Sequence, residues 1–101
     1  MGIYAIMSDS DWPFDQPGDA KAVTTMGILE HDLEIMLAEY YADDNIWGFF
    51  CGTTEKEEDG RVITLEEILA KDASLKEIAH MKPGQRAWRA NKESPWNIEN
   101  T

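Results

Sequence analysis

The strongest constraint on the fold is a run of apolar residues at positions 46–51, with the sequence Ile-Trp-Gly-Phe-Phe-Cys. Aromatic and β-branched residues favour strands, and this run has the length of a typical strand. The residues before it, Ala42-Asp43-Asp44-Asn45, are of the kind found in turns. Positions 46–51 are therefore predicted to form a strand that begins after a turn, with Trp47 buried in the core.

Residues 29–41 precede this turn and allow two interpretations. Their apolar residues recur at helical spacing, with Glu30, Glu34 and Ala38 on the other side, which favours a helix. A strand would separate apolar from polar residues less well, but it would form a hairpin with residues 46–51. Periodicity alone favours the helix, and the hairpin is the alternative. The apolar residues at helical spacing are Leu29, Leu33, Met36, Leu37, Tyr40 and Tyr41.

The other strands and loops are predicted from local composition. Short apolar or β-favouring runs bounded by polar residues indicate strands, and stretches rich in Pro, Gly and Asp indicate loops. By these signals we expect strands over 3–7, 22–26, 61–63 and 85–90, a loop over 9–20 and a tail over 91–101.

Two short helices are predicted between residue 64 and the last strand. Thr64 and Glu67 have the spacing of a capping box, in which the two residues at a helix start satisfy each other's backbone N–H groups. Ser74 and Glu77 have the same spacing and predict a second box. Pro83 and the glycine after it end the second helix.

The length of 101 residues is enough for one core, so we expect a single domain over 1–101. No apolar run approaches the roughly 20 residues that span a bilayer, and the first residues resemble no leader peptide. The single cysteine, Cys51, has no internal disulfide partner, which fits a reducing compartment. We therefore expect a soluble cytoplasmic protein.

The formal charge of −11 is concentrated in the first part of the chain. Residues 1–60 hold 14 acidic residues and two lysines, whereas residues 61–101 hold six acidic and seven basic residues. Such a field repels nucleic acid and anionic membrane surfaces and attracts basic partners. The simpler explanation is that the acidity keeps a small protein soluble.

No catalytic, cofactor or metal site is predicted. His31 and His80 lack the spacing of metal ligands, and no second cysteine completes a zinc site. Cys51 follows an apolar run, where thiols are usually inert. The aspartates of 9–15 lack the glycine and the closing glutamate of a calcium loop.

The four tryptophans are more informative than the titratable residues. Trp47 and Trp88 lie in predicted strands and are expected in the core. Trp12 and Trp96 lie in polar segments that contain proline. If exposed, they are candidate anchors for a partner, and if packed down, they tether a loop and the tail, which is the favoured alternative.

A recognisable pattern, mostly between Asp43 and Trp96, is formed by the segments Asp44–Gly52, Leu65–Ile68, Asp72–Leu75, Pro83-Gly84 and Trp88-Arg89, with Val23–Thr25 and Ile28–Glu30 upstream. This pattern resembles a small bacterial family of uncharacterised proteins. Members of that family have been linked to the immunity proteins of polymorphic toxin systems. The resemblance implies an α+β domain around an antiparallel sheet, in which residues 33–41 pair with 46–51 as a hairpin, and it implies immunity-like binding.

With the resemblance added, we expect an α+β fold with about five antiparallel strands and two short helices after the central hairpin. The expected function is that of a non-catalytic protein-binding domain, immunity-like, that neutralises a basic partner. One alternative is a housekeeping or regulatory domain that is acidic only for solubility, and another is a small hydrolase or ligand-binding enzyme. The candidate partner-binding residues are Asp43, Asp44, Glu55, Glu57, Glu58, Asp59, Trp12 and Trp96.

Overall fold

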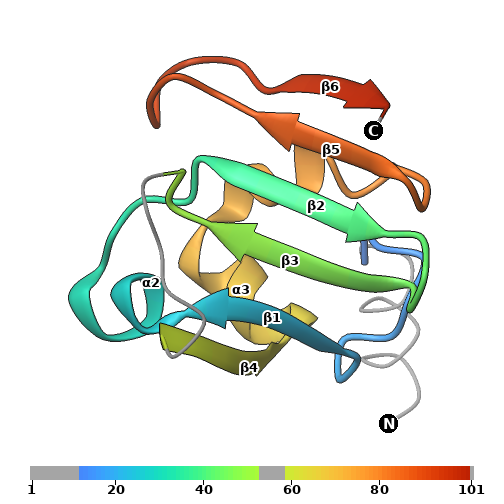
Figure 1. Cartoon of the computed structure of the whole chain (residues 1–101), viewed down its shortest axis with the longest axis horizontal. Coiled ribbons are helices and arrows are strands. Elements are labelled where there is room, and N and C mark those ends of the chain that lie inside the picture. Colours follow the sequence, from blue (N-terminus) through green and yellow to red (C-terminus); the bar gives the residue numbers. More distant parts are fainter. Residues whose placement is uncertain (1–11, 53–58, 101) are drawn as a thin grey trace, which may run out of the picture.

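The structure is a computed structural model that describes residues 12–52 and 59–100. Its α+β class, predicted from the sequence, is confirmed: a six-stranded sheet has the order β4-β1-β3-β2-β5-β6 and is packed against short helices (Figure 1). The strand expected over 3–7 lies outside the described residues. The elements are β1 (Lys21–Thr25), α2 (Met26–His31), β2 (Leu37–Tyr41), β3 (Ile46–Phe50), β4 (Gly60–Thr64), α3 (Leu65–Lys71), the 3-10 helix η2 (Ala73–Glu77), β5 (Gln85–Trp88) and β6 (Asn97–Asn100).

The central hairpin of β2 and β3 is present, and the continuous helix favoured by periodicity over residues 29–41 is wrong. The two strands are antiparallel, from Leu37 opposite Phe50 to Tyr41 opposite Ile46. Residues 33–36, which were expected in the first strand, lie outside it. The turn between them closes with Asn45 at φ 55°, a conformation that asparagine tolerates well. Because β3 lies in the middle of the sheet, a helix in place of β2 would leave the backbone groups along one edge of β3 without partners.

Only the first part of the periodic stretch is helical. The helix α2 begins at Met26, a residue that was expected to end a strand. Its six residues form fewer than two helical turns. It ends at Asp32, whose φ of 55° places it in the left-handed region while its N–H donates to the Gly27 carbonyl. This cap turns the chain so that it can run back along the sheet as β2.

The sheet is mixed, not purely antiparallel, and it has more strands than the five expected. Strand β1 runs parallel to β3, with Ala22 opposite Trp47, and antiparallel to β4. The tail expected over 91–101 is corrected as well, because residues 97–100 pair with β5 as strand β6. An ion pair of 2.8 Å between Arg86 and Glu99 joins the two strands.

The helical segment after β4 is capped twice. The box of Thr64 and Glu67 is confirmed, with both backbone hydrogen bonds made. The second box is wrong, because Asp72 and not Ser74 is the cap: its carboxylate accepts the Ser74 N–H at 3.0 Å and starts the 3-10 helix η2. None of the helices among residues 12–52 and 59–100 is long and apolar enough to cross a membrane.

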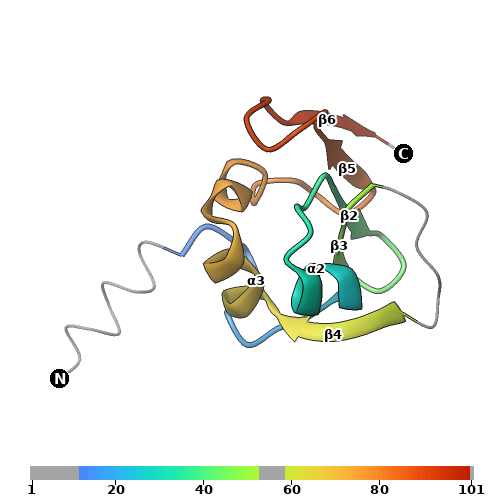
Figure 2. The same ribbon diagram turned by 90° about the vertical axis from the view of Figure 1, so that its left-hand side faces the viewer.

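The core lies between one face of the sheet and this helical layer. Figure 2 views the sheet near its edge and shows α3 on one side of it. Trp47 is fully buried, stacked on Tyr40 at 4.6 Å between ring centroids and met edge-on by Phe14 from the N-terminal loop. The helical layer and the sheet contribute the remaining core side chains, which include Phe49, Ile63, Leu65, Ile68, Leu75, Ile78 and Met81.

Arg89, directly after β5, is the one buried cation among the described residues. Its guanidinium donates to the Ile35 carbonyl at 2.7 and 3.0 Å, to the Asp72 carboxylate at 2.7 Å and to the Ser74 hydroxyl at 3.0 Å. The ring of Trp96 covers it at 4.2 Å. These contacts join the start of β2, the cap of η2 and the C-terminal segment around a single side chain.

We expect Trp47→Ala to lower the free energy of unfolding by about 3–5 kcal/mol, the usual cost of removing a buried aromatic ring. Urea denaturation measures the change. The control Val62→Thr alters a side chain that is 65% exposed and should stay within about 0.5 kcal/mol of the wild type. A near-neutral result for Trp47→Ala would contradict the position of this ring in the core.

Asp72 should give the protein a specific sensitivity to acid. Burial raises the pKa of its carboxyl, but hydrogen bonds from Ser74 and Arg89 outweigh burial and hold the pKa below its ordinary value of 3.8. Because the folded pKa is lower than the unfolded one, this carboxylate stabilises the fold above about pH 4 and stops doing so as the pH falls through the folded value.

The variant Asp72→Asn should therefore be less stable than the wild type at neutral pH, by about 3 kcal/mol for a broken buried pair, and should lose less stability in acid. Urea denaturation from neutral pH down to about 2.5 gives both quantities. Glu77→Gln, an exposed carboxylate on η2, controls for the loss of one negative charge. If the free energy of unfolding fell equally with decreasing pH in Asp72→Asn and in the wild type, the stabilising role of the Asp72 carboxylate would be excluded.

Candidate functional site

The second face of the sheet carries no helix or strand from residues 12–52 and 59–100, and we call it the open face. Residues opposite one another in register share a face, so the strand pairings show which side chains lie on the open face. One row crosses all six strands, from Val62 on β4 through Val23, Gly48, Glu39 and Arg86 to Glu99 on β6. The open face is thus a continuous surface with a known order of side chains.

Two further rows on the open face are apolar. Trp88, Leu37 and Phe50 lie side by side on β5, β2 and β3. Tyr41 and Ile46 lie next to each other beside the turn. Trp88 is 44% exposed, Val62 65% and Tyr41 36%, so large apolar side chains meet solvent across the sheet.

Gly48 leaves space for the rings of Phe50 and Tyr41 above the middle of the sheet. A Cβ atom at this position would come within 2.8 Å of Phe50 and 2.9 Å of Tyr41 ring carbons. Any larger residue would therefore push the rings outward. The absence of a side chain at Gly48 therefore permits the observed positions of the Phe50 and Tyr41 rings.

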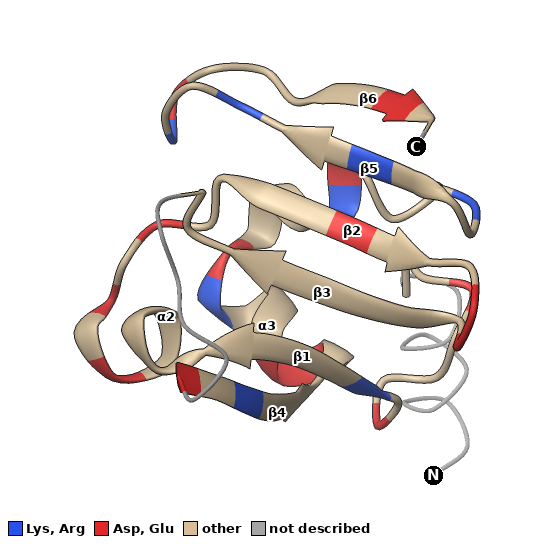
Figure 3. Cartoon of the chain, in the orientation of Figure 1, with Lys and Arg blue, Asp and Glu red and all other residues tan. Residues whose placement is uncertain are grey.

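The charges on the open face are few, as Figure 3 shows for β1, β2 and β3. Glu39, half-buried in the middle of the sheet, forms no ion pair with any cation of residues 12–52 and 59–100. By contrast, Arg86 is paired with Glu99, and hydrogen bonds from Arg86 and Trp88 lower the pKa of that carboxyl. Burial and the nearby Glu39 carboxylate raise the pKa of Tyr41. Glu39 is therefore the carboxylate at the centre of the open face, and Arg86 lies opposite it on β5 while paired with Glu99.

The predicted acidic residues are divided between two ends of the sheet. Asp43 and Asp44 are exposed at the turn before β3, and Asp59 precedes β4 at the opposite end (Figure 3). Asp59 is therefore separated from Asp43 and Asp44 by the length of a strand. The other candidates, Glu55, Glu57 and Glu58, lie outside the described residues.

The tryptophans are placed differently from one another. Trp12 and Trp96 pack against the core, so the predicted tethering is confirmed for both. The Trp12 indole N–H donates to the Gln16 carbonyl at 2.6 Å. Trp88 was predicted in the core, which is wrong: it lies on the open face. The alternation of side chains along residues 86–89 indicates this position of Trp88. Trp88 shares its face with Arg86, while Ala87 and Arg89 are buried.

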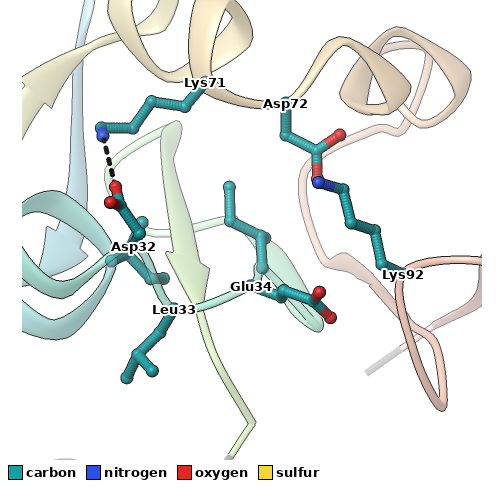
Figure 4. Close-up of a pocket in the computed structure, with 8 residues that line it drawn as sticks. Asp32, Leu33, Glu34, Lys71, Asp72 and Lys92 are labelled. Atoms are coloured by element: carbon teal, nitrogen blue, oxygen red, sulfur yellow. Dashed lines mark ion pairs between the residues drawn. The ribbon is translucent and has the colours of Figure 1, made fainter.

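A hollow of about 280 Å³ lies on the helical side, between the end of α2 and the end of α3 (Figure 4). Lys71 reaches Asp32 at 4.0 Å, and Figure 4 shows Lys92 extended toward Asp72. Asp72 is committed to Arg89, so the remaining charges, Glu34 included, are balanced and exposed. This hollow has no buried polar group directed at a ligand.

The titratable residues considered for chemistry lie apart. His31 and His80 are both exposed, and Cys51 is buried at the end of β3. The described residues hold no group of three or more His, Cys, Asp or Glu side chains arranged to bind a metal ion. The open face is therefore the surface with the most distinctive composition, and it is the candidate functional site.

Comparisons with family models, with curated proteins and with solved structures found no match to this chain.

Proposed function

We propose that this chain is a non-catalytic protein-binding domain that docks a basic partner on its open face. The observation that carries the proposal is the row of Trp88, Leu37 and Phe50, together with Tyr41 and Val62, on a sheet face without a covering element among the described residues. Large apolar side chains gathered on a surface are typical of interaction sites.

The dimensions of the open face favour a protein over a small molecule. Neighbouring strands are about 4.8 Å apart, so the row from Val62 to Glu99 is about 24 Å long. Small ligands bind in enclosed pockets, whereas protein interfaces are broad and have aromatic residues near their centres. Tyr41, Phe50 and Trp88 supply such residues here.

The charge of the molecule favours a basic partner. A neutral surface would bury the Glu39 carboxylate without an ion pair, which is costly, because the Arg86 guanidinium opposite it is already bound to Glu99. A second copy of the chain would bring another molecule of charge −11 to the same face. A partner with Lys or Arg opposite Glu39 avoids both costs, and Asp43, Asp44 and Asp59 at the two ends attract it from a distance.

Neutralisation of a toxin is the form of binding that the family resemblance favours, in the cytoplasm of a bacterial cell. An immunity protein must cover a surface on its target tightly, and an aromatic face with acidic ends suits a basic toxin domain. A regulatory domain with another basic partner would use the same contacts. The two roles differ in whether the partner is toxic to the cell and is inhibited by this chain.

The test compares two doubly substituted variants with the same change in charge. Tyr41→Lys with Val62→Lys places two cations on the open face, and Ala70→Lys with Ala73→Lys places them on exposed positions of the helical layer. Partners retained by the immobilised wild type are purified, and their affinity for each variant is measured at several salt concentrations.

We expect the purified partner to be basic and to bind the open-face variant at least about tenfold more weakly than the wild type, as for interface positions that contribute much of the binding energy. It should bind the helical-layer variant with nearly the wild-type affinity. Its affinity for the wild type should also fall as salt rises, because exposed charges are screened. A purified partner that binds the open-face variant as tightly as the wild type would refute the proposed docking surface.

A further inference from the structure

A groove of about 580 Å³ opens at the end of the open face where β2 begins and β3 ends. It continues the row of Trp88 and Leu37, so it belongs to the surface on which the proposed function rests. A hollow of this size accepts a ligand-sized group. The lining residues are Met36, Leu37, Cys51, Gly52, Arg86, Trp88, Arg89 and Ala90.

The Trp88 ring lines one side of the groove, and hydrogen bonds within the chain hold it in position without a partner. Its indole N–H donates to the Glu99 carboxylate at 3.3 Å, and Arg86 donates to the same carboxylate at 2.8 Å. The polar edge of the ring is thereby satisfied, while 44% of the residue remains exposed. A side chain that enters the groove meets an aromatic wall whose position is already fixed.

The floor of the groove is apolar and contains sulfur. Met36 and Cys51 line it beside Leu37, and thioether and thiol groups make favourable contacts with aromatic rings. Gly52 keeps the groove open, because a Cβ atom there would lie 3.2 Å from the Cβ of Met36. Its φ of 84° is also a conformation that other residues rarely adopt.

The charges around the groove determine which side chain fits. None of the lining residues in the described part of the chain is a carboxylate. The two guanidinium groups are already paired, Arg86 with Glu99 and Arg89 with Asp72. A cation entering the groove would therefore lose water without gaining a counterion, whereas a neutral ring gains contacts with Trp88 and the sulfur atoms.

We propose that this groove is the anchor pocket of the interface and takes an aromatic side chain of the basic partner. Glu39 lies two residues along β2 from Leu37 and on the same face, a distance of about 7 Å. A Lys or Arg one or two residues from the anchor can therefore reach it. The recognised segment is an aromatic residue flanked by basic residues.

Synthetic peptides test the proposal with the full-length chain. One capped peptide has a central phenylalanine between pairs of lysines, a second has alanine at the centre, and a third has the phenylalanine between pairs of glutamates. Titrations followed by NMR, through the methionine methyl groups and backbone amides, give both the affinity and the location of binding.

We expect the phenylalanine–lysine peptide to bind at least about tenfold more tightly than the alanine peptide and to shift the signals of Met36, Gly52 and Ala90. The variant Ala90→Phe, which fills the groove from an exposed position, should abolish this preference. Ala70→Phe, on the exposed side of α3, should retain it. Circular dichroism verifies that both variants are folded.

The outcomes separate the anchor pocket from the proposed function. Equal binding of the phenylalanine and alanine peptides, with shifts on the open face, would overturn the pocket and leave the docking of basic partners intact. A preference for phenylalanine that survives Ala90→Phe would also overturn the pocket. Equal binding of the lysine and glutamate peptides in the groove would support the pocket and refute the basic partner.

Discussion

The C-terminal third of the structure depends on the buried guanidinium of Arg89. Arginine has five N–H donors and no acceptor, so burying it is costly unless every donor finds an oxygen. Here the oxygens come from Ile35, Asp72, Ser74 and the Lys92 carbonyl. All four positions lie outside the strands, so the side chain fixes the helical segment and the returning chain relative to the segment that leads into β2.

The hydrogen bonds of Arg89 also affect the position of Trp88 in the candidate site. Strand β5 pairs with β2 over three residues only, and β6 pairs with β5 alone. Arg89, at the end of β5, strengthens this short pairing with hydrogen bonds to the start of β2. It thereby places Trp88, its neighbour in the chain, on the opposite side of the sheet. The position of the aromatic wall on the open face is thus a result of the buried charge beneath it.

The two faces of the sheet differ because the helical layer is small. The segments α3 and η2 bring Leu65, Ile68, Leu75 and other apolar residues to one face, where Trp47 and Phe49 complete the core. The described chain has no second helical layer to cover the other face. Apolar residues on that face are consequently left for solvent or for a partner, and Glu39 is the carboxylate at their centre.

The sequence by itself determined the features that depend on neighbours in the chain. The strand around Trp47, the turn at Asp43-Asp44-Asn45 and the box of Thr64 and Glu67 were predictable, because each uses residues within a few positions. Periodicity failed for β2, since Leu33, Met36 and Tyr40 have helical spacing, yet the strand follows from pairing with β3. The burial of Trp47 was predicted as well, but the exposure of Trp88 and the burial of Arg89 were decided in the tertiary structure.

Trp88 and Arg89 show the physical reason most clearly. An aromatic residue is normally buried and an arginine exposed, and this pair reverses both expectations. The reversal depends on the Ile35 carbonyl, 54 residues away in sequence, which accepts the guanidinium. Such oxygens come together only when the sheet, η2 and the C-terminal segment have assembled. The open face and its groove could therefore not be located from local composition, because they are defined by pairings between distant parts of the chain.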